Sequence, residues 1–362
     1  MRILRNYILK DFFSAFIFSL LSLSMVLLLG NIMKISDMVV RKGVNIFDAI
    51  QILMFFMPYV LGFTLPLAFL LGTLLTMGRL VGENEIVAIN TAGVSSLKIL
   101  HIFMLMAVAG TLFLFILNDR VIPGFHYRYR TELKNIYTKN IGALIEPRVF
   151  LEHFQDFIVY VSDMDGNKLK NVYIYETKKG KAASKVTFAK TAEFAVDGDM
   201  LKMKLDDGFR DETAADPKQL YRLSFKTFFI DIPISKPKGA KVDKKPGDMT
   251  IQELHAREKE LKKLGVNPLE IAAEFHKRIS FSCSIIIFTL LAFAVSLIVR
   301  HREKSINFGI AFVIAGTYYL LFIFGETMVE YHKIIPWLGM WLPNIIIGAI
   351  GAHLTLKHAH FK

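Results

Sequence analysis

The chain has 362 residues, of which 53% are hydrophobic and 21% charged, with a formal net charge of +12. A basic excess of this size is found in nucleic-acid-binding proteins, but here Lys and Arg gather in one polar block and beside the ends of apolar stretches. No aromatic-rich RNA motif or recognition helix accompanies them, which excludes nucleic acid as a partner. The single cysteine, Cys283, permits no intrachain disulfide. The composition fits a chain divided between lipid and water.

Six long stretches contain no Asp, Glu, Lys or Arg. A bilayer core of about 30 Å needs about 20 apolar residues of helix, and buried helices of soluble proteins rarely stay uncharged for so long. We therefore predict an α-helical membrane protein with six transmembrane helices, three before and three after one polar block. The six stretches are Phe12–Met33, Ala49–Gly78, Ile99–Leu117, Ile279–Val299, Ser305–Gly325 and Ile334–Leu356.

The orientation follows from Lys and Arg near the helix ends, which accumulate on the cytoplasmic side of membrane proteins. If the N-terminus is cytoplasmic, the short outer loops hold only Lys34, Arg41, Lys42 and Lys333. The first helix is too long for a cleaved signal and lacks a small-x-small cleavage site, so we expect it to be retained. Both termini are predicted in the cytoplasm and the polar block in the periplasm of a bacterial inner membrane. The cytoplasmic segments would carry Arg2, Arg5, Lys10, Arg79, Lys98, Arg300, Arg302, Lys304, Lys357 and Lys362.

The polar block alternates β-branched and aromatic runs with turn signals from Arg148 to about Ser235. Short strands at this spacing favour an antiparallel sandwich, roll or barrel, here a β-sandwich or jelly-roll-like domain. The turn signals are Asp165-Gly166-Asn167, Asp197-Gly198-Asp199 and Asp207-Gly208.

Helical flanks are predicted on both sides of this sheet. Tyr127–Asn140 is polar and helical in pattern, and Thr250–Leu264 begins with a capping box of Thr250 and Glu253 and ends before Gly265. The predicted domains are residues 1–118 for helices one to three, 119–275 for the periplasmic block with its flanks, and 276–362 for helices four to six.

The loop between the second and third apolar stretches, residues 78–93, is more apolar than a loop that only connects two helices would need to be. Ile86, Ile89 and Asn90 fall three and four residues apart, and Glu83 and Glu85 lie in the first turn, where carboxylates oppose the helix dipole. This pattern predicts a short helix that Gly93 ends. We expect it to dock into a groove on a peripheral protein. The alternative is a segment resting on lipid, which the acidic residues disfavour because the inner leaflet is anionic.

At this point the sequence resembles a known family, the lipopolysaccharide-export permeases (LptF/LptG), over its whole length. The loop and the Arg278 region look closer to the LptF branch. One departure is that the family often has a proline soon after the Lys/Arg pair, where this chain has Ser280-Phe281-Ser282-Cys283. The motifs that carry the resemblance are Pro66-Leu67-Ala68-Phe69-Leu70-Leu71-Gly72, Gly78-Arg79-Leu80, Glu85-Ile86, Ala92-Gly93-Val94-Ser95, Met249-Thr250-Ile251-Gln252-Glu253-Leu254 and Glu274-Phe275-His276-Lys277-Arg278.

The resemblance implies a permease subunit of an ABC transporter that extracts lipopolysaccharide from the inner membrane and passes it to a periplasmic bridge. The implied partners are a second, LptG-like permease paralogue, a cytoplasmic LptB-like ATPase dimer, a single-span periplasmic LptC-like protein and an LptA-like bridge. It also implies that residues 83–93 form the coupling helix. Glu83, Glu85, Ile86 and Ile89 would contact the ATPase, with Glu85 matching the acidic position of the family.

A cationic cluster follows the first helix on the predicted outer side: Lys34, Arg41 and Lys42. Such a cluster can pair with lipid A phosphates, because Lys acts as a point charge and Arg as a bidentate fork. Lys34 falls where the family has a basic residue facing lipopolysaccharide. The alternative for all three is ordinary snorkelling of basic side chains to phospholipid.

No catalytic, cofactor-binding or metal-binding constellation stands out in the sequence. Lys178-Lys179-Gly180-Lys181 lacks the spacing of a phosphate-binding loop, so ATP hydrolysis is expected to come from another polypeptide. The rival interpretation is a non-transporting inner-membrane scaffold that presents a periplasmic β-domain for protein interaction. A lipid-modifying membrane enzyme ranks third.

Overall fold

A computed structural model describes residues 2–40, 44–139, 147–154, 157–165, 168–176, 185–197, 200–213, 220–233, 244–299 and 304–359. By their contacts, the residues form two compact units. The helical unit comprises Met1–Met33, Ile52–Tyr129 and Lys244–Lys362, and the β unit comprises Lys34–Gln51 and Arg130–Asp243. Residues 244–275, which the composition groups with the polar block, thus belong to the helical unit.

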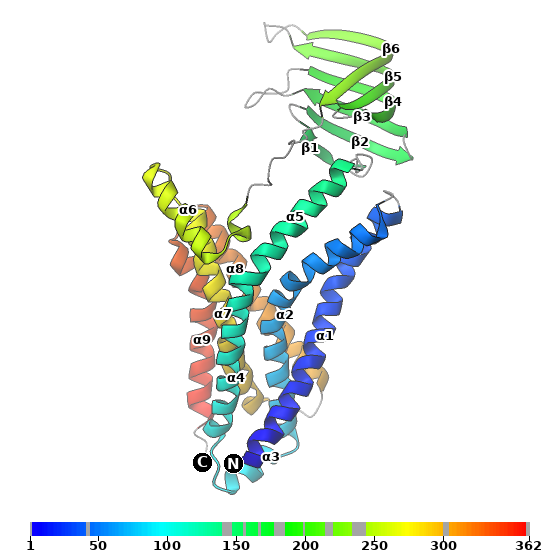
Figure 1. Cartoon of the computed structure of the whole chain (residues 1–362). Coiled ribbons are helices and arrows are strands. Elements are labelled where there is room, and N and C mark those ends of the chain that lie inside the picture. Colours follow the sequence, from blue (N-terminus) through cyan, green and yellow to red (C-terminus); the bar gives the residue numbers. More distant parts are fainter. Residues whose placement is uncertain are drawn as a thin grey trace. The chain divides into compact units, whose positions relative to one another are not determined.

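The helices follow one another along the chain as the apolar stretches predict (Figure 1). Within the described residues, six helical segments are long and apolar enough to cross a membrane. The predicted fold class, an α-helical membrane protein with an inserted β domain, is confirmed. The helices are α1 (Arg2–Val40), α2 (Ile46–Gly82), α3 (Glu85–Thr91), α4 (Ser96–Ile116), α5 (Ile122–Lys139), α6 (Ile251–Lys263), α7 (Leu269–Ile298), α8 (Lys304–Glu330) and α9 (Pro336–Ala359).

Two helices, α2 and α7, form the centre of the helical unit. In their most apolar windows 78% and 61% of the residues are buried, against 17% in α1 and 22% in α8. Leu70 and Leu74 of α2 and Phe288 of α7 are fully buried in one core. The outer helices leave large apolar side chains uncovered, such as Phe312 of α8, which is 80% exposed. Surfaces of this kind are stable in lipid rather than in water.

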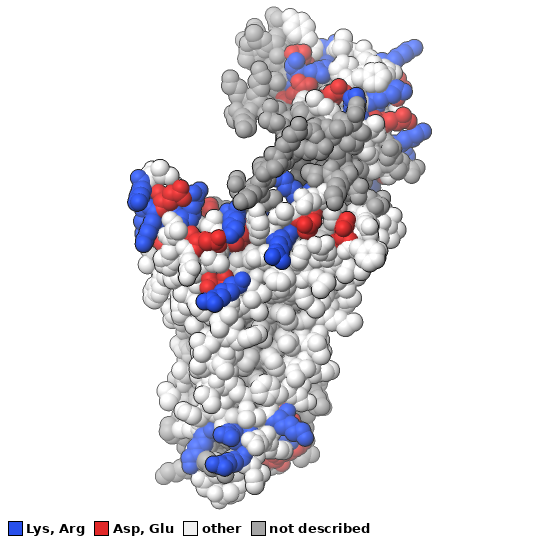
Figure 2. All heavy atoms as spheres, in the orientation of Figure 1, with Lys and Arg blue, Asp and Glu red and all other residues white. Residues whose placement is uncertain are grey.

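The charged side chains of the helical unit lie toward its two ends. Figure 2 shows Lys, Arg, Asp and Glu at both ends and a band of uncharged residues between them. Helix α3 lies at one end, where α1 begins and α9 ends, and α6 lies at the other (Figure 1). We call these the α3 end and the α6 end.

The third long helix is continuous through a π-helical turn. Segment η1, Leu117–Val121, joins α4 to α5 without a break. The predicted polar helix Tyr127–Asn140 is therefore the continuation of the third apolar helix, as far as Lys139 in the described residues. A π turn adds one residue to the helical repeat, and such turns are frequent at functional sites. Here it carries Asn118 and Asp119.

The predicted capping box of α6 is confirmed. Thr250 N donates to Glu253 Oε2 at 2.8 Å, and Glu253 N donates to Thr250 Oγ1 at 3.3 Å. A hydrogen bond from Lys244, and then the one from the Thr250 backbone, hold the pKa of Glu253 below its usual range. Gly265 ends the helix region with φ +73°, as the Gly at this position predicts.

Helix α7 runs unbroken through the four residues that replace the family's proline pattern. The hydroxyl of Ser280 donates to Met340 O at 2.5 Å, and Asn344 Nδ2 donates to Ser280 O at 2.7 Å. The Tyr318 hydroxyl in turn donates to Asn344 Oδ1 at 3.1 Å. These buried bonds join α7, α8 and α9.

The described strands of the β unit form one antiparallel sheet in which each strand pairs with its neighbours in sequence. The sequence left open whether the strands form a sandwich, a roll or a barrel. The described strands form a single sheet in up-and-down order. The core of the unit lies on one face and includes Leu151, Val172 and Ile232. The strands are β1 (Phe150–Phe154), β2 (Phe157–Asp165), β3 (Lys168–Glu176), β4 (Lys185–Asp197), β5 (Met200–Thr213) and β6 (Leu220–Pro233).

A kink row crosses strands β2 to β6 at one level. In each of these strands the pairing leaves out one residue and continues on the other side of it in the same register. On β3, for example, Lys170 and Asn171 both point away from the core between buried Leu169 and Val172. The alternation of faces is thereby reset, so both halves of the sheet bury their apolar residues on the same side. The skipped residues are Ser162, Asn171, Lys190, Asp207 and Lys226.

The expectation of a turn at Asp207-Gly208 is wrong. Both residues lie inside β5, where Asp207 has φ 53° and takes part in the kink row. A Cβ on Gly208 would collide with the Phe188 carbonyl oxygen of β4. Glycine at this position therefore allows β4 and β5 to approach closely, and the Asp207-Gly208 dipeptide lies at the kink of β5 rather than in a turn. Of the two other turn signals, Asp165 and Asp197 end β2 and β4, and residues 166–167 and 198–199 lie outside the described residues.

Candidate functional site

At the α3 end, one arginine gathers three carboxylates from three elements. Arg79, in the last turn of α2, lies 3.1 Å from Asp11 of α1, 3.1 Å from Glu83 and 2.8 Å from Glu85 of α3. The Tyr7 hydroxyl donates to the same Glu85 oxygen at 2.9 Å, and the guanidinium lies 5.3 Å from the Tyr7 ring centroid. We call these five residues the Arg79 cluster. It ties the short helix to α1 and α2 and carries two more carboxylates than cations.

The predicted short helix is present as α3, but it runs from Glu85 to Thr91, so Glu83 lies in the turn before it. Gly93 follows the helix with φ +83°. Ile86 is 6% exposed and belongs to the core of the helical unit, and Ile89 packs against that core. The outward residues of α3 are instead Val87, Ala88, Asn90 and Thr91. Ile86 and Ile89 thus hold the helix on its own unit, and a partner would meet the other face.

Glu83, in the turn before α3, and Glu85, in its first turn, differ in their surroundings. The Glu85 side chain is 29% exposed and bonded to Arg79 and Tyr7, whereas the Glu83 side chain is 53% exposed. Glu83 is therefore the more accessible carboxylate.

Of the predicted headgroup cluster, the described residues include only Lys34. It lies near the end of α1, within the β unit, and its side chain is exposed. Arg41 and Lys42 lie outside the described residues.

At the α6 end, a second arginine, Arg278, has a different set of partners. Arg278 of α7 is 5% exposed. Its Nε donates to Glu274 at 2.9 Å, its Nη1 to the Met249 carbonyl at 2.5 Å, and its Nη2 to the carbonyls of Pro246 and Gly247 at 3.1 and 3.2 Å. The guanidinium thereby fixes segment η3 (Pro246–Asp248) to α7.

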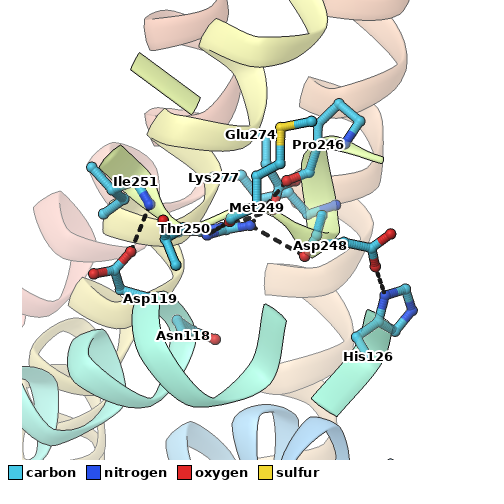
Figure 3. Close-up of polar contacts among 12 residues, drawn as sticks. Asn118, Asp119, His126, Pro246, Asp248, Met249, Thr250, Ile251, Glu274 and Lys277 are labelled. Atoms are coloured by element: carbon cyan, nitrogen blue, oxygen red, sulfur yellow. Dashed lines mark hydrogen bonds and ion pairs between the residues drawn. The ribbon is translucent and has the colours of Figure 1, made fainter. Parts of the chain in front are cut away.

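Two further polar contacts attach η3 and the start of α6 to the third long helix. His126 Nδ1 and Asp248 Oδ1 are 2.6 Å apart, and Ile251 N donates to Asp119 Oδ1 at 2.7 Å. Asp119 caps the first turn of α6 from the π-helical turn η1. The chain re-entering the helical unit is thus held by α5, η1 and α7 together (Figure 3).

Next to this attachment lies a cavity of about 490 Å³ between α2, η1, α5, α7 and α8. Lys277 Nζ and Glu326 Oε1 are 2.6 Å apart on its wall and join α7 to α8. The rings of Phe63, Phe281 and Phe322 line its apolar side. The full lining is Tyr59, Gly62, Phe63, Asn118, Ile122, His126, Gly247, Glu274, Lys277, Arg278, Phe281, Tyr319, Phe322, Ile323 and Glu326.

Sequence reasoning singled out parts of this region without assembling it. Lys277 and Arg278 belong to one of the sequence motifs described above, but no partner of Lys277 was predicted from the sequence. The structure pairs Glu326 with Lys277 of α7. A signal for this exists, because Lys277 and Glu326 lie at the same edge of adjacent apolar stretches.

Within the described residues, six membrane-type helices, an inserted antiparallel sheet and a short helix fixed at one end define a polytopic membrane protein with an inserted β domain. The family model for "Lipopolysaccharide export system permease LptF/LptG" matches residues 6–357. The chain belongs to this family.

Among similar proteins is the lipopolysaccharide export system permease protein LptG of Escherichia coli strain K12, 22% identical over 367 aligned residues that cover 98% of each chain. LptG of E. coli O6:H1, strain CFT073, matches equally well. Identity at this level does not assign the branch, so the LptF-like character stays a prediction from the sequence.

Proposed function

We propose that this chain is the permease subunit of an ABC transporter that extracts lipopolysaccharide from the bacterial inner membrane and passes it to a periplasmic bridge. Membership of the export-permease family supports this role. ATP hydrolysis would be carried out by a partner, a cytoplasmic LptB-like ATPase dimer. The other proposed partners are a second LptG-like permease, a single-span LptC-like protein and an LptA-like bridge. The α3 end would face the cytoplasm with both termini, and the β unit would lie in the periplasm.

The observation that carries the proposal is the Arg79 cluster. It places three partly exposed carboxylates, Asp11, Glu83 and Glu85, around one guanidinium at the end of two long helices. A basic groove on an ATPase would complement these carboxylates. Because Arg79 bonds α3 to α1 and α2, a displacement of the docked helix would be passed to both spans. In this proposal Glu83 and Glu85 meet the ATPase, and Ile86 and Ile89 anchor the helix from behind.

The lipid would be recognised at the opposite side of the membrane. Lys34, exposed near the end of α1, is proposed to contact a lipid A phosphate together with Arg41 and Lys42. The acyl chains would contact apolar surface, at about 0.8 kcal/mol per buried CH₂. The apolar face of the β unit is proposed to receive these chains during transfer.

The test is mass spectrometry of what copurifies with the full chain from its native membrane in mild detergent. A stoichiometric ATPase, a second permease and bound lipopolysaccharide are the expected result. A preparation without ATPase and glycolipid, even after crosslinking, would overturn the transporter and favour the scaffold that presents a β-domain.

A further inference from the structure

The cavity beside Arg278 combines a paired positive and negative charge with an aromatic wall. Of its charged lining residues, Arg278 is fully occupied by Glu274 and three backbone carbonyls. Lys277 and Glu326 are different, because each side chain is 35% exposed while their charged atoms are 2.6 Å apart. They present one ammonium and one carboxylate to whatever enters the cavity.

The size of the cavity limits its occupant. Its volume of about 490 Å³ is within the range of about 300–1,000 Å³ that holds one drug-sized ligand. A glycolipid with several acyl chains and a sugar backbone is far larger than this. A single headgroup with the start of one acyl chain has a fitting size.

The cavity also reaches the outside of the helical unit. Ile323 of α8 lines it and is 58% exposed. The apolar wall next to this opening consists of stacked and edge-on rings, with the Phe281 centroid 5.3 Å from Phe63 and 5.8 Å from Phe322. In a membrane-spanning unit, an opening on an apolar helix surface admits lipid more readily than a water-soluble ligand.

We propose that this cavity is a binding site for a zwitterionic phospholipid with a primary ammonium, a phosphatidylethanolamine. The lipid phosphate lies at Lys277, the ammonium donates hydrogen bonds to Glu326, and the first part of an acyl chain packs on the phenylalanine wall. With a zwitterion bound, the lipid phosphate lies next to the Lys277 ammonium and the lipid ammonium next to the Glu326 carboxylate. Each charge in the cavity then has an opposite charge beside it. A purely anionic headgroup would instead place its charge beside Glu326 and Glu274. This site is separate from the one proposed for the exported glycolipid.

The experiment is native mass spectrometry of the full chain, with any copurified partners, titrated with phosphatidylethanolamine or phosphatidylglycerol of identical acyl chains. We expect phosphatidylethanolamine to bind about fivefold more tightly, the factor that one partly exposed ion pair can supply. Glu326→Gln leaves Lys277 without its carboxylate and should reverse the preference toward phosphatidylglycerol. Lys277→Gln removes the contact to the phosphate that both lipids carry, so it should weaken the binding of both while the preference for phosphatidylethanolamine remains.

Two further variants separate binding from folding. Glu330→Gln changes an exposed carboxylate one turn along α8, outside the cavity, and should leave the preference unchanged. The double exchange Lys277→Glu with Glu326→Lys keeps an ion pair between α7 and α8 and should keep the preference for phosphatidylethanolamine. Equal binding of both lipids by the wild-type protein, or the same preference in Glu326→Gln as in Glu330→Gln, would overturn the proposal. Neither readout depends on an ATPase or on lipopolysaccharide, so this result and that of the copurification test are independent.

Discussion

The two ends of the helical unit each depend on one arginine, and the partners of these arginines differ. Arg278, at the α6 end, is 5% exposed and bonds three backbone carbonyls and one carboxylate. The Arg79 side chain, at the α3 end, is 26% exposed and bonds three side-chain carboxylates. Backbone carbonyls cannot turn away without moving the chain, whereas exposed carboxylates can exchange partners with water. The α6 end is therefore built as a fixed attachment and the α3 end as an exchangeable one.

The largest effect is expected at the fixed attachment. Arg278→Met leaves Glu274 and three carbonyls without their donor and should destabilise the helical unit by roughly 3–5 kcal/mol, as breaking a buried ion pair does. Thermal unfolding in detergent measures this. Arg278→Lys keeps the charge but loses the planar guanidinium, so its melting temperature should lie between those of the wild type and Arg278→Met. An unchanged melting temperature in Arg278→Met would show that the attachment does not stabilise the unit.

At the Arg79 cluster, Arg79→Gln should lower stability less than Arg278→Met does, and its main effect should be on ATPase association. The carboxylates it leaves can turn to water, so we expect a loss of about 1–2 kcal/mol. The amount of ATPase copurified per permease should fall more strongly, because α3 is no longer fixed to α1 and α2. Arg79→Lys is the matched control and should retain part of the association. If Arg79→Gln unfolded like Arg278→Met, the contrast between the two ends would be wrong.

The contrast between the two ends can be tested further at Glu83, in the turn before α3, and at Glu85, in the first turn of α3. Glu83→Lys reverses the charge of the more exposed carboxylate and should lower ATPase association while changing stability by less than about 1 kcal/mol. Glu85→Lys should lower both, since it also loses Arg79 and Tyr7. Copurification and melting temperature, measured on the same preparations, separate the two effects. The scaffold interpretation expects little change in association from either variant.

The smallest effect concerns the cap of α6. Hydrogen bonds from Lys244 and Thr250 lower the pKa of Glu253 in the folded protein. The ionised Glu253 therefore contributes its full stabilisation of the folded state above the pKa of a glutamate in the unfolded chain, about 4.3. This stabilisation is lost as the pH falls through the lower pKa of the folded state. The side chain is 42% exposed, which limits the contribution to about 0.5–1 kcal/mol. Amide hydrogen exchange in the first turn of α6 should rise as the pH falls through the lowered pKa of Glu253. Glu253→Gln should remove this pH dependence, and a wild-type profile equal to that of the variant would contradict it.

Local patterns were readable from the sequence, and long-range polar attachments were not. The six apolar stretches and the Thr250 capping box depend on neighbouring residues, and both are present. The partners of Arg278 are backbone carbonyls 29 to 32 residues away, which no side-chain pattern marks. The inward orientation of Ile86 also escaped prediction, because helical periodicity defines a face without saying what that face contacts.

The strands of the β unit were predicted from their composition, but a simple period-two pattern cannot assign one face to a whole strand. The kink row resets the alternation in the middle of each strand, so the period-two pattern does not run through. In β5 the same row turns Asp207-Gly208, a dipeptide typical of turns, into part of a strand.

The kink row also restricts how this sheet can change in evolution or in the laboratory. Because five strands skip a position at the same level, a one-residue deletion on one side of the row would invert the faces of only that half-strand. Its buried residues would then face solvent beside unchanged neighbours. A viable length change must therefore occur as whole residue pairs or in all five strands together. The effect of an insertion in this domain thus depends on its position relative to the kink row.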